Sequence, residues 1–472
     1  MELSSRDFEE KARNALKDPD LQIALQRIEK GFGHLRIAAS KGLPEFETLR
    51  DEGRDIKNHV LENLDHYLVR FEEKVLASGG QVHWCGDSDE ARATILKLCR
   101  DADAKTVTKG KSMIAEEIGI NKYLEDNGIA PIETDMGEYI IQLADETPSH
   151  LLGPALHKTR EQITELFYEQ HQKYGRNARL TEGRELINEA RGILREKYFA
   201  ADVGITGANF LIAETGSTVI VTNEGNGDLT QLLPKMHIVI ASLEKVVPTL
   251  EDASTLLRLL ARSATGQEMS VYTTFSTGPR REDDLDGPAA FHVVLLDNGR
   301  SKLLGGPFQE VLRCIRCAAC MNTCPVYGAV GGHAYGAVYM GPIGAVLTPH
   351  LVGIDDAYHL PNASTFCGRC EEVCPVRIPL PKLMRTWRER GFERELTPPR
   401  ERWALKAWAW VAKRPRLYRL GTRIGMRTLH LLSFGRGRLK SVPFAGGWTG
   451  TRDLPAPEGE TFMAAWRRGK RP

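Results

Sequence analysis

The sequence predicts an α/β protein whose chain continues into a smaller, mainly helical domain rich in cysteine. Three observations support this prediction. Strand-like and helix-like segments alternate between residues 76 and 300, seven of the nine cysteines lie between residues 314 and 374, and apolar side chains recur at helical spacing before residue 76. A chain of 472 residues has room for two or three domains. Its composition, 42% hydrophobic and 26% charged, is that of an ordinary globular protein.

Residues 1–75 are expected to form a helical arm that packs on the next domain. Apolar residues follow helical spacing in its second half, at Leu49, Ile56, Val60, Leu64, Leu68 and Phe71. The charged N-terminal segment lacks the apolar core of an export signal, and the chain has no run of about 18 apolar residues. We therefore expect a cytoplasmic protein without a membrane-spanning helix.

Residues 76–300 are expected to form an α/β domain with a largely parallel sheet, because helical segments separate most of its strands. Segments 159–175 and 249–266 have helical patterns. A tight turn is expected between two of the strands, and Gly216 is expected to adopt the positive φ that such a turn requires. The predicted strands are 105–110, 129–135, 203–206, 210–215, 218–223, 237–242, 269–275 and 291–297.

Residues 301–390 contain two related cysteine motifs, CIRCAACMNTCP (314–325) and STFCGRCEEVCP (364–375). The spacing C-x2-C-x2-C-x3-C-P is typical of ferredoxins with two iron–sulfur clusters, in which the last cysteine of each motif binds the other cluster. Soft thiolate ligands suit such clusters, whereas zinc sites prefer two short pairs with a long spacer. The predicted ligands are Cys314, Cys317, Cys320 and Cys374 for the first cluster, and Cys324, Cys367 and Cys370 for the second.

The second cluster therefore has only three cysteine ligands, because Ser364 stands where the first motif has Cys314. Three explanations remain open. Ser364 or another oxygen or nitrogen group supplies the fourth ligand, the cluster is [3Fe–4S], or one iron is open to solvent or to a partner. Cys85 and Cys99 lie in strand-like and helical segments, and we expect both to be buried free cysteines.

Two flanking segments have unusual compositions. Residues 325–354 contain no Asp, Glu, Lys or Arg and are rich in Gly and Pro, so we expect a close-packed loop beside something buried. Residues 391–472 form a basic region in which Trp403, Trp408 and Trp410 lie among cations. Such a region is typical of peripheral contact with an anionic membrane or an acidic partner, although a helix docked on the protein's own surface has the same pattern. Nucleic acid is the weaker interpretation, because no recognition fold accompanies the charge.

The α/β domain contains weaker candidate sites. The segment KGKS (109–112) resembles the end of a phosphate-binding loop, but the first glycine of that motif is missing. Lys109, Lys111 and Ser112 could still bind an anion at the start of a helix, and a solvated turn is the alternative. Several acidic residues lie at the end of a predicted strand, and two histidines follow them. They could take part in acid–base or metal chemistry, or they could simply be solvated loop residues. These residues are Glu133, Asp135, Glu138, His150 and His157.

Several long segments resemble the bacterial lactate utilization protein B family. They are residues 109–143, 148–160 and 204–226, both cysteine motifs, and the C-terminal segment PFAGGWTGTRDLPAPEGETFMAAWRR. The resemblance implies a lactate-utilization α/β domain similar to ribose-5-phosphate isomerases and CoA transferases, followed by a two-cluster [4Fe–4S] domain. It also implies an electron-transferring component of L-lactate oxidation to pyruvate that works with a cysteine-rich iron–sulfur protein and a smaller protein with a related α/β domain. One departure from ferredoxin loops is Ala318, where Gly is usual and Gly368 stands in the second motif.

Two other functions remain open from the sequence. The chain could be an iron–sulfur subunit for another 2-hydroxy acid or for glycerol 3-phosphate. It could also be an enzyme whose α/β domain is catalytic, with Glu214 as the candidate nucleophile by analogy with CoA transferases. Residues 223–227 (NEGNG) could hold a phosphate through backbone amides, or form a plain turn.

Overall fold

The computed structural model describes residues 3–442, 445–450 and 452–469. The chain forms two compact units, residues 1–390 and residues 391–472, and each is described by itself. The first unit begins with the expected helices: α1 (Phe8–Ala15), α2 (Pro19–Ile28), α3 (His34–Lys41), α4 (Phe46–Glu62) and α5 (Leu64–Ala77).

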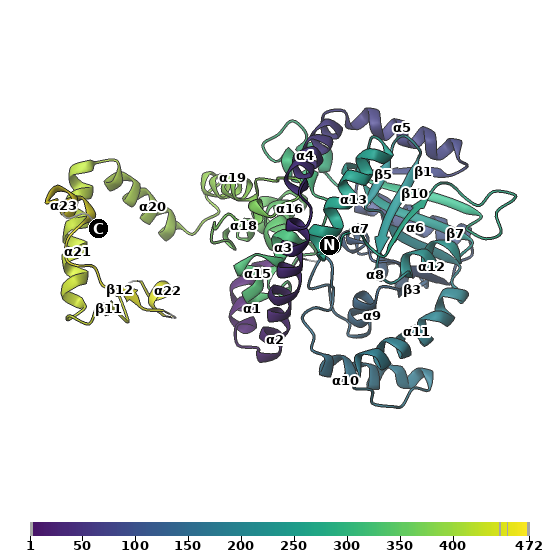
Figure 1. Cartoon of the computed structure of the whole chain (residues 1–472), viewed down its shortest axis with the longest axis horizontal. Coiled ribbons are helices and arrows are strands. Elements are labelled where there is room, and N and C mark those ends of the chain that lie inside the picture. Colours follow the sequence, from purple (N-terminus) through teal and green to yellow (C-terminus); the bar gives the residue numbers. More distant parts are fainter. Residues whose placement is uncertain (1–2, 443–444, 451, 470–472) are drawn as a thin grey trace. The chain divides into compact units, whose positions relative to one another are not determined.

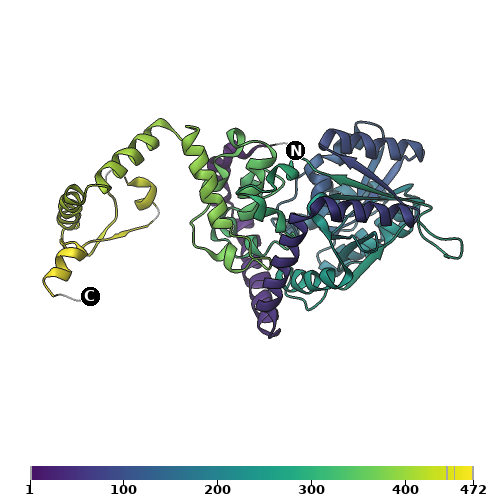
Figure 2. The same ribbon diagram turned by 90° about the horizontal axis from the view of Figure 1, so that it is seen from above.

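The first helices lie against the cysteine-rich part of the chain as well as the α/β domain. They are purple in Figure 2, beside the green cysteine-rich part. Arg36 donates from Nη2 to the carbonyl of Val373 at 2.8 Å, and Gln22 donates to the carbonyl of Ala329 at 3.0 Å. The arm therefore connects the two parts of the first unit.

The α/β domain is built on a six-stranded, fully parallel sheet. The strand order is β1-β10-β7-β4-β2-β3. From β2 the chain moves outward to β3, and from β4 it moves the other way through β7 to β10, so the winding direction reverses between β2 and β4. The strands are β1 (Gln81–Cys85), β2 (Thr106–Lys109), β3 (Ala130–Glu133), β4 (Val203–Gly207), β7 (Met236–Ser242) and β10 (Ala290–Leu296).

Helices cover both faces of this sheet (Figure 1). On one face, α6 (Ser88–Asp101), α7 (Met113–Ile118) and α8 (Ile120–Glu125) pack on the strands around a buried apolar core. On the other face, α4 and α5 form a second core with β7 and β10. Burial on both faces explains why β7 and β10 are largely apolar.

Four further strands form a separate, mixed sheet in the order β8-β5-β6-β9. They are β5 (Phe210–Ile212), β6 (Ser217–Thr222), β8 (Val246–Val247) and β9 (Tyr272–Ser276). Gly216 has the predicted positive φ, 72°, in the turn between β5 and β6. A Cβ at this position would also lie 2.6 Å from the backbone of α5, so the turn needs glycine for space as well.

Five further helices complete the α/β domain. The first three, α9 to α11, share a small core of their own. They are α9 (Met136–Leu143), α10 (Arg160–Gln170), α11 (Gly183–Ala200), α12 (Asn226–Leu232) and α13 (Leu250–Ala264).

The cysteine-rich part is helical, as predicted, but the prediction of a loop over residues 325–354 was wrong. This segment contains α15 (Pro325–Val330) and the buried helix α16 (Gly341–Leu351). Pro325 and Pro342 lie in the first turns of these helices, where a missing N–H costs nothing. The remaining helices are α14 (Ala319–Asn322), α17 (Ile354–Ala357), α18 (Arg369–Glu372) and α19 (Leu380–Glu393).

The second unit consists mainly of α20 (Pro399–Ala412) and α21 (Pro415–Leu432), and neither helix buries a residue. Two short strands pair antiparallel, β11 (Arg438–Leu439) and β12 (Leu454–Pro455). The helices α22 (Gly446–Thr449) and α23 (Phe462–Arg467) complete it. None of the helices in the described ranges is both long and apolar enough to cross a membrane.

Candidate metal centre

Two cavities in the cysteine-rich part are lined by thiols. The first is lined by Cys314, Cys317, Cys320 and Cys374, together with Arg316 and apolar side chains. The second is lined by Cys324, Cys367 and Cys370, together with Ser364. Each cavity therefore receives cysteines from both motifs, because the last cysteine of each motif lines the cavity of the other.

The two cysteine loops share one backbone conformation at an offset of 50 residues. Arg316 and Phe366 have φ values of 61° and 56°, and Ala318 and Gly368 have values of 57° and 84°. A short helix follows each loop, and α14 and α18 begin at equivalent residues. Ala318 thus adopts the left-handed conformation that ferredoxin loops usually give to glycine, at a cost of about 1–2 kcal/mol.

Ser364 occupies in the second loop the place that Cys314 occupies in the first. The N–H of Arg316 donates to Sγ of Cys314 at 3.4 Å, and the N–H of Phe366 donates to Oγ of Ser364 at 3.1 Å. Equivalent backbone amides, those of Arg316 and Phe366, therefore orient a thiol in the first loop and a hydroxyl in the second. This places a hydroxyl oxygen at the corner of the second cavity where a cysteine is missing.

Six of the seven thiols that line the cavities are buried or half-buried, and burial changes their acidity. Burial raises the pKa of Cys317 and Cys370 to about 12, raises the pKa of Cys374 to about 11, and raises the pKa of Cys320 well above its ordinary value. In the second cavity, by contrast, Cys367 is exposed. Because metal ligands are thiolates, loading these cavities with metal releases protons.

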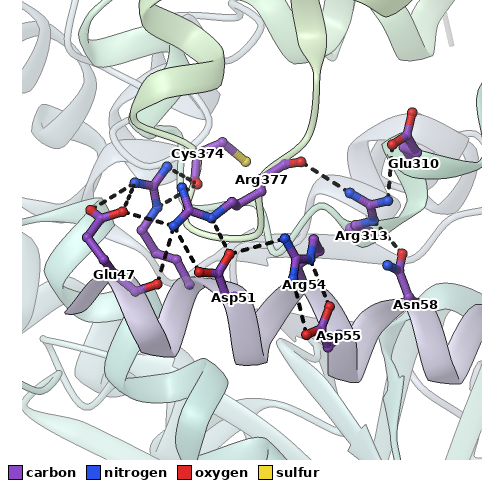
Figure 3. Close-up of polar contacts among 10 residues, drawn as sticks. Glu47, Asp51, Arg54, Asp55, Asn58, Glu310, Arg313, Cys374 and Arg377 are labelled. Carbon is purple, nitrogen blue, oxygen red and sulfur yellow. Dashed lines mark hydrogen bonds and ion pairs between the residues drawn. The ribbon is translucent and has the colours of Figure 1, made fainter. Parts of the chain in front are cut away.

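Helix α4 holds the loop that carries Cys374 (Figure 3). Arg50 is 5% exposed and donates from Nε and Nη2 to the carbonyl oxygen of Cys374 at 3.1 and 2.9 Å. Its Nη1 also pairs with Glu47 at 2.8 Å. Three residues after the cysteine, Arg377 pairs with Asp51 at 2.6 Å and with Glu47 at 3.0 Å. A helix 324 residues earlier in the chain thus fixes the loop on which the first cavity depends.

A row of buried ion pairs joins the α/β domain to the first cysteine loop. Arg300 pairs with Glu117 at 2.5 Å and with Glu244 at 3.3 Å. Glu244 also pairs with Arg316 at 3.2 Å, and the Arg316 guanidinium lies 4.6 Å from the ring centre of Tyr339. No pattern in the sequence indicates these ion pairs, because their members are far apart in the chain.

Two buried lysines also lie near Cys314. Burial lowers the pKa of Lys57 to about 8 and that of Lys245 to about 7, and the negative charge of a Cys314 thiolate would counter both shifts. Together with Arg316, these lysines outnumber the one buried carboxylate beside them, Glu244, so the surroundings of this thiol favour negative charge. Buried cations favour an anionic occupant of the first cavity, and a cluster held by four thiolates is such an occupant. The residues present therefore fit iron–sulfur clusters in both donor type and electrostatics.

Comparisons with known proteins agree with these observations. Three family models match the chain: a LUD domain at residues 68–296, a 4Fe-4S dicluster domain at residues 310–378, and the C-terminal domain of lactate utilisation protein B at residues 383–471. The chain is 44% identical to the lactate utilization protein B of Anoxybacillus flavithermus over 98% of each chain. The corresponding protein of Lysinibacillus sphaericus is 43% identical over 98% of this chain and 97% of its own.

The chain belongs to the lactate utilization protein B family. The predicted resemblance and the predicted fold class, an α/β lactate-utilization domain followed by a two-cluster [4Fe–4S] domain, are thereby confirmed. As a member of this family the chain is an iron–sulfur protein.

The two isolated cysteines of this lactate utilization protein B family member lie away from both cavities. Cys85 and Cys99 belong to the apolar core between α6 and the sheet. Cys85 bonds to Thr94 on α6 at 3.7 Å. The catalytic candidate Glu214 lies in the turn between β5 and β6. It accepts the N–H of Leu250 at 3.3 Å and so contributes to the N-terminal cap of α13.

In the segment KGKS, Lys109 and Ser112 already have partners within the α/β domain. Lys109 is fully buried and pairs with Glu116 at 2.9 Å and with Glu133 at 2.8 Å, so its ammonium is already committed to carboxylates. Ser112 caps α7 by accepting the N–H of Ala115. In NEGNG, Gly225 adopts a positive φ of 70° at the start of α12.

The two histidines do not join the acids of the strand end. His150 is fully buried, and its Nε2 lies 2.8 Å from Oδ1 of Asn322. Burial lowers its pKa to about 3, so the ring is neutral. The His150–Asn322 pair connects the α/β domain to the first cysteine motif. The sequence analysis did not predict this contact; the one available signal was that Asn322 lies between two cysteines of the motif. His157 pairs with Glu146 at 2.6 Å.

Proposed function

We propose that this chain is the iron–sulfur electron-transfer subunit of a multi-protein system that oxidises L-lactate to pyruvate. The observation that carries the proposal is the pair of thiol-lined cavities, which share the cysteines of both motifs within one domain. The name of the relatives, lactate utilization protein B, supports the substrate. Oxidation of lactate to pyruvate releases two electrons and two protons, which suits a carrier with two one-electron centres.

The ligands that we propose follow the two cavities. Cys314, Cys317, Cys320 and Cys374 hold the first [4Fe–4S] cluster. For the second, we propose Cys324, Cys367 and Cys370, with the Ser364 hydroxyl as the fourth ligand; a [3Fe–4S] cluster is the alternative. Bound there, the clusters accept and release single electrons, while the protein sets their potentials through burial and N–H bonds to sulfur.

The burial of the thiols supports an order for the two centres. The first cavity is lined by Leu151 of the α/β domain and receives the buried cations around Cys314. The second contains the exposed Cys367. We therefore propose that the second cluster exchanges electrons with a redox partner, and that the first cluster lies deeper in the protein. The proposed partners are a cysteine-rich iron–sulfur protein and a smaller protein with a lactate-utilization α/β domain.

An enzyme whose α/β domain is catalytic is the second candidate function. Glu214 is its weak candidate nucleophile, and unchanged lactate-dependent turnover in a Glu214→Gln variant would remove that residue from consideration. An iron–sulfur subunit for another 2-hydroxy acid or for glycerol 3-phosphate is the third. Growth of a deletion strain on lactate separates this last alternative from the proposal.

Anaerobically purified protein is expected to contain about eight irons with matching sulfide, because each cavity takes one cubane cluster. Metal and sulfide analysis measures this content, and EPR spectroscopy of the oxidised and reduced protein identifies the clusters. About seven irons and a signal in the oxidised protein would assign a [3Fe–4S] cluster to the second cavity. Zinc without sulfide would contradict the proposed function.

For the basic C-terminal unit we propose contact with an anionic membrane surface. Arg416, Arg419, Arg423 and Arg427 lie at spacings of three and four residues on α21, and thus on one face of the helix. An adjoining stripe of exposed apolar residues contains Leu417, Leu420, Ile424 and Leu431. A cationic face beside an apolar stripe is typical of helices that lie in the surface of an anionic bilayer.

Co-sedimentation with vesicles tests this contact. The full chain is expected to bind vesicles that contain phosphatidylglycerol and to remain in solution with pure phosphatidylcholine, because each basic residue near an anionic surface contributes about 1 kcal/mol. Ile424→Asp, in the apolar stripe, should weaken binding strongly, whereas Asp126→Asn on the α/β domain should not. Equal binding to both vesicle types, or to neither, would contradict the assignment.

A further inference from the structure

A group of acidic side chains lies at the carboxyl ends of β2 and β3, beside the point where the winding of the sheet reverses. Glu133 is the last residue of β3, Glu116 lies on α7 directly after β2, and Glu138 lies on α9 directly after β3. In open α/β sheets, ligands bind outside the carboxyl ends of the strands at this reversal. The group therefore lies where the fold itself favours a binding site, on an edge of the domain that the cysteine motifs do not use.

The three carboxylates converge closely. One oxygen from each of Glu116, Glu133 and Glu138 lies within 4.8 Å of the other two. A magnesium ion with oxygen ligands at about 2.1 Å holds opposite ligands roughly 4.2 Å apart. The three oxygens are thus already near the spacing of ligands around one small cation.

Two of these acids have oxygen atoms that accept no hydrogen bond within the described part of the chain. Glu138 is 1% exposed and its Oε1 has no partner, and Glu133 is 2% exposed and its Oε2 has no partner. The other oxygen of Glu133 accepts from Lys109 and from Asn121, so this side chain is held in place while one lone-pair face stays open. Buried carboxylate oxygens without a donor are costly unless something pairs with them.

The charges of the group do not balance. Three carboxylates carry three negative charges, and Lys109 supplies one positive charge, which leaves two negative charges in a buried place. Burial and the neighbouring acids raise the pKa of both Glu133 and Glu138, so protons could cover part of the excess. A single divalent cation would neutralise the group without any proton. The surrounding Lys111, Asp135 and Glu224 add further net negative charge, which disfavours an anionic ligand.

We propose that Glu116, Glu133 and Glu138 form a binding site for one divalent cation, with Lys109 as the neighbouring fixed charge. Carboxylate oxygens are hard ligands and suit Mg²⁺ or Mn²⁺ rather than a metal that prefers thiolates. The side chains present leave room in the coordination shell for water or for an oxygen-bearing ligand. The site is independent of the iron–sulfur clusters and of the proposed function, because its ligands belong only to the α/β domain.

Mn²⁺ binding tests the site in the full-length, cluster-containing protein after removal of loosely bound metal on a chelating resin. At room temperature the six-line EPR signal of free Mn²⁺ reports how much of the added metal is bound. We expect one Mn²⁺ per chain, competed by Mg²⁺, and a rise of the thermal midpoint with Mn²⁺ concentration. Glu138→Gln, which is isosteric, should weaken binding at least tenfold, and Glu116→Gln should do the same.

Asp202→Asn is the matched control, because it removes one carboxylate at the opposite end of β2, where Asp202 accepts the N–H groups of Lys105 and Thr106. It should bind Mn²⁺ like the unaltered protein. Absence of binding in the unaltered protein, or equal binding in Glu138→Gln and Asp202→Asn, would overturn the site. Visible absorbance measures the cluster content of each variant separately, so a failure of the iron–sulfur assignment cannot be mistaken for a failure of this one.

Discussion

The Cys374→Ala variant is expected to lose the cluster of the first motif and to keep the cluster of its own motif. Cys374 lines the cavity of Cys314, Cys317 and Cys320, whereas Cys367 and Cys370 line the other cavity. Iron content should fall from about eight to about four per chain. The EPR signal that remains in the reduced protein should be that of the second cluster.

The reciprocal variant, Cys324→Ala, should lose the second cluster and keep the first. Ser364→Cys tests the second cluster without removing a ligand. It adds a thiol at the corner where the N–H of Phe366 already orients the side chain of residue 364. Only the signal of the second cluster should change in that variant. If Cys374→Ala instead lost the cluster of Cys367 and Cys370, the crossed assignment would be wrong.

The Glu117→Gln variant is expected to destabilise the first unit by about 3–5 kcal/mol, the usual cost of breaking a buried ion pair from one side. Glu117 is 1% exposed and accepts from both Nη atoms of Arg300, from Asn298 at 2.6 Å and from Tyr339 at 2.6 Å. An amide cannot satisfy these donors, and Arg300 would keep only Glu244, which it shares with Arg316, to balance its buried charge. The thermal midpoint under anaerobic conditions measures the effect.

The matched control is Asp126→Asn, in an exposed pair with Lys122, which should cost less than about 1 kcal/mol. An effect of Glu117→Gln no larger than that of this control would contradict the importance of the row.

The pH dependence of stability follows from the same carboxylate. Burial alone would raise the pKa of Glu117, but the charge of Arg300 and the hydrogen bonds from Arg300, Tyr339 and Asn298 outweigh it, so the pKa is lowered. The contribution is thus complete above the unfolded value of about 4.3 and is lost as the pH falls through the lower folded value. Glu117→Gln lacks this contribution, so its stability should fall less steeply between these two pKa values than that of the unaltered protein.

The sequence predicted those parts of the structure that local patterns determine. The spacing of the cysteines and the offset of 50 residues indicated which thiols share a cavity, because motif and offset can be read along the chain. The offset also indicated that Ser364 corresponds to Cys314. The α/β domain followed from alternating segments, but alternation alone did not show that the strand at residues 210–212 belongs to a second sheet.

Interactions between distant residues could not be predicted from one sequence. Arg300 and Glu117 are 183 positions apart, and His150 and Asn322 are 172 apart, so no local pattern pairs them. The loop predicted around α16 was wrong for a different reason. Proline was treated as a helix breaker, although Pro342 lies in the first turn, where it is compatible with the helix, and α16 also contains Pro349 in its interior.

The crossing of the two cysteine motifs constrains the order of events during synthesis of the protein. Cys374 leaves the ribosome 60 positions after Cys314, which at about 5–20 residues per second is a delay of roughly 3–12 s. Until then the first three thiols have no fourth partner, while helix α4, which will hold the loop of Cys374, is already made. With the ligands that we propose, neither cluster can be completed on a nascent chain that stops between the motifs. Cluster assembly would then follow translation of the whole cysteine-rich part, and the thiols of the first motif would have to stay reduced until that point.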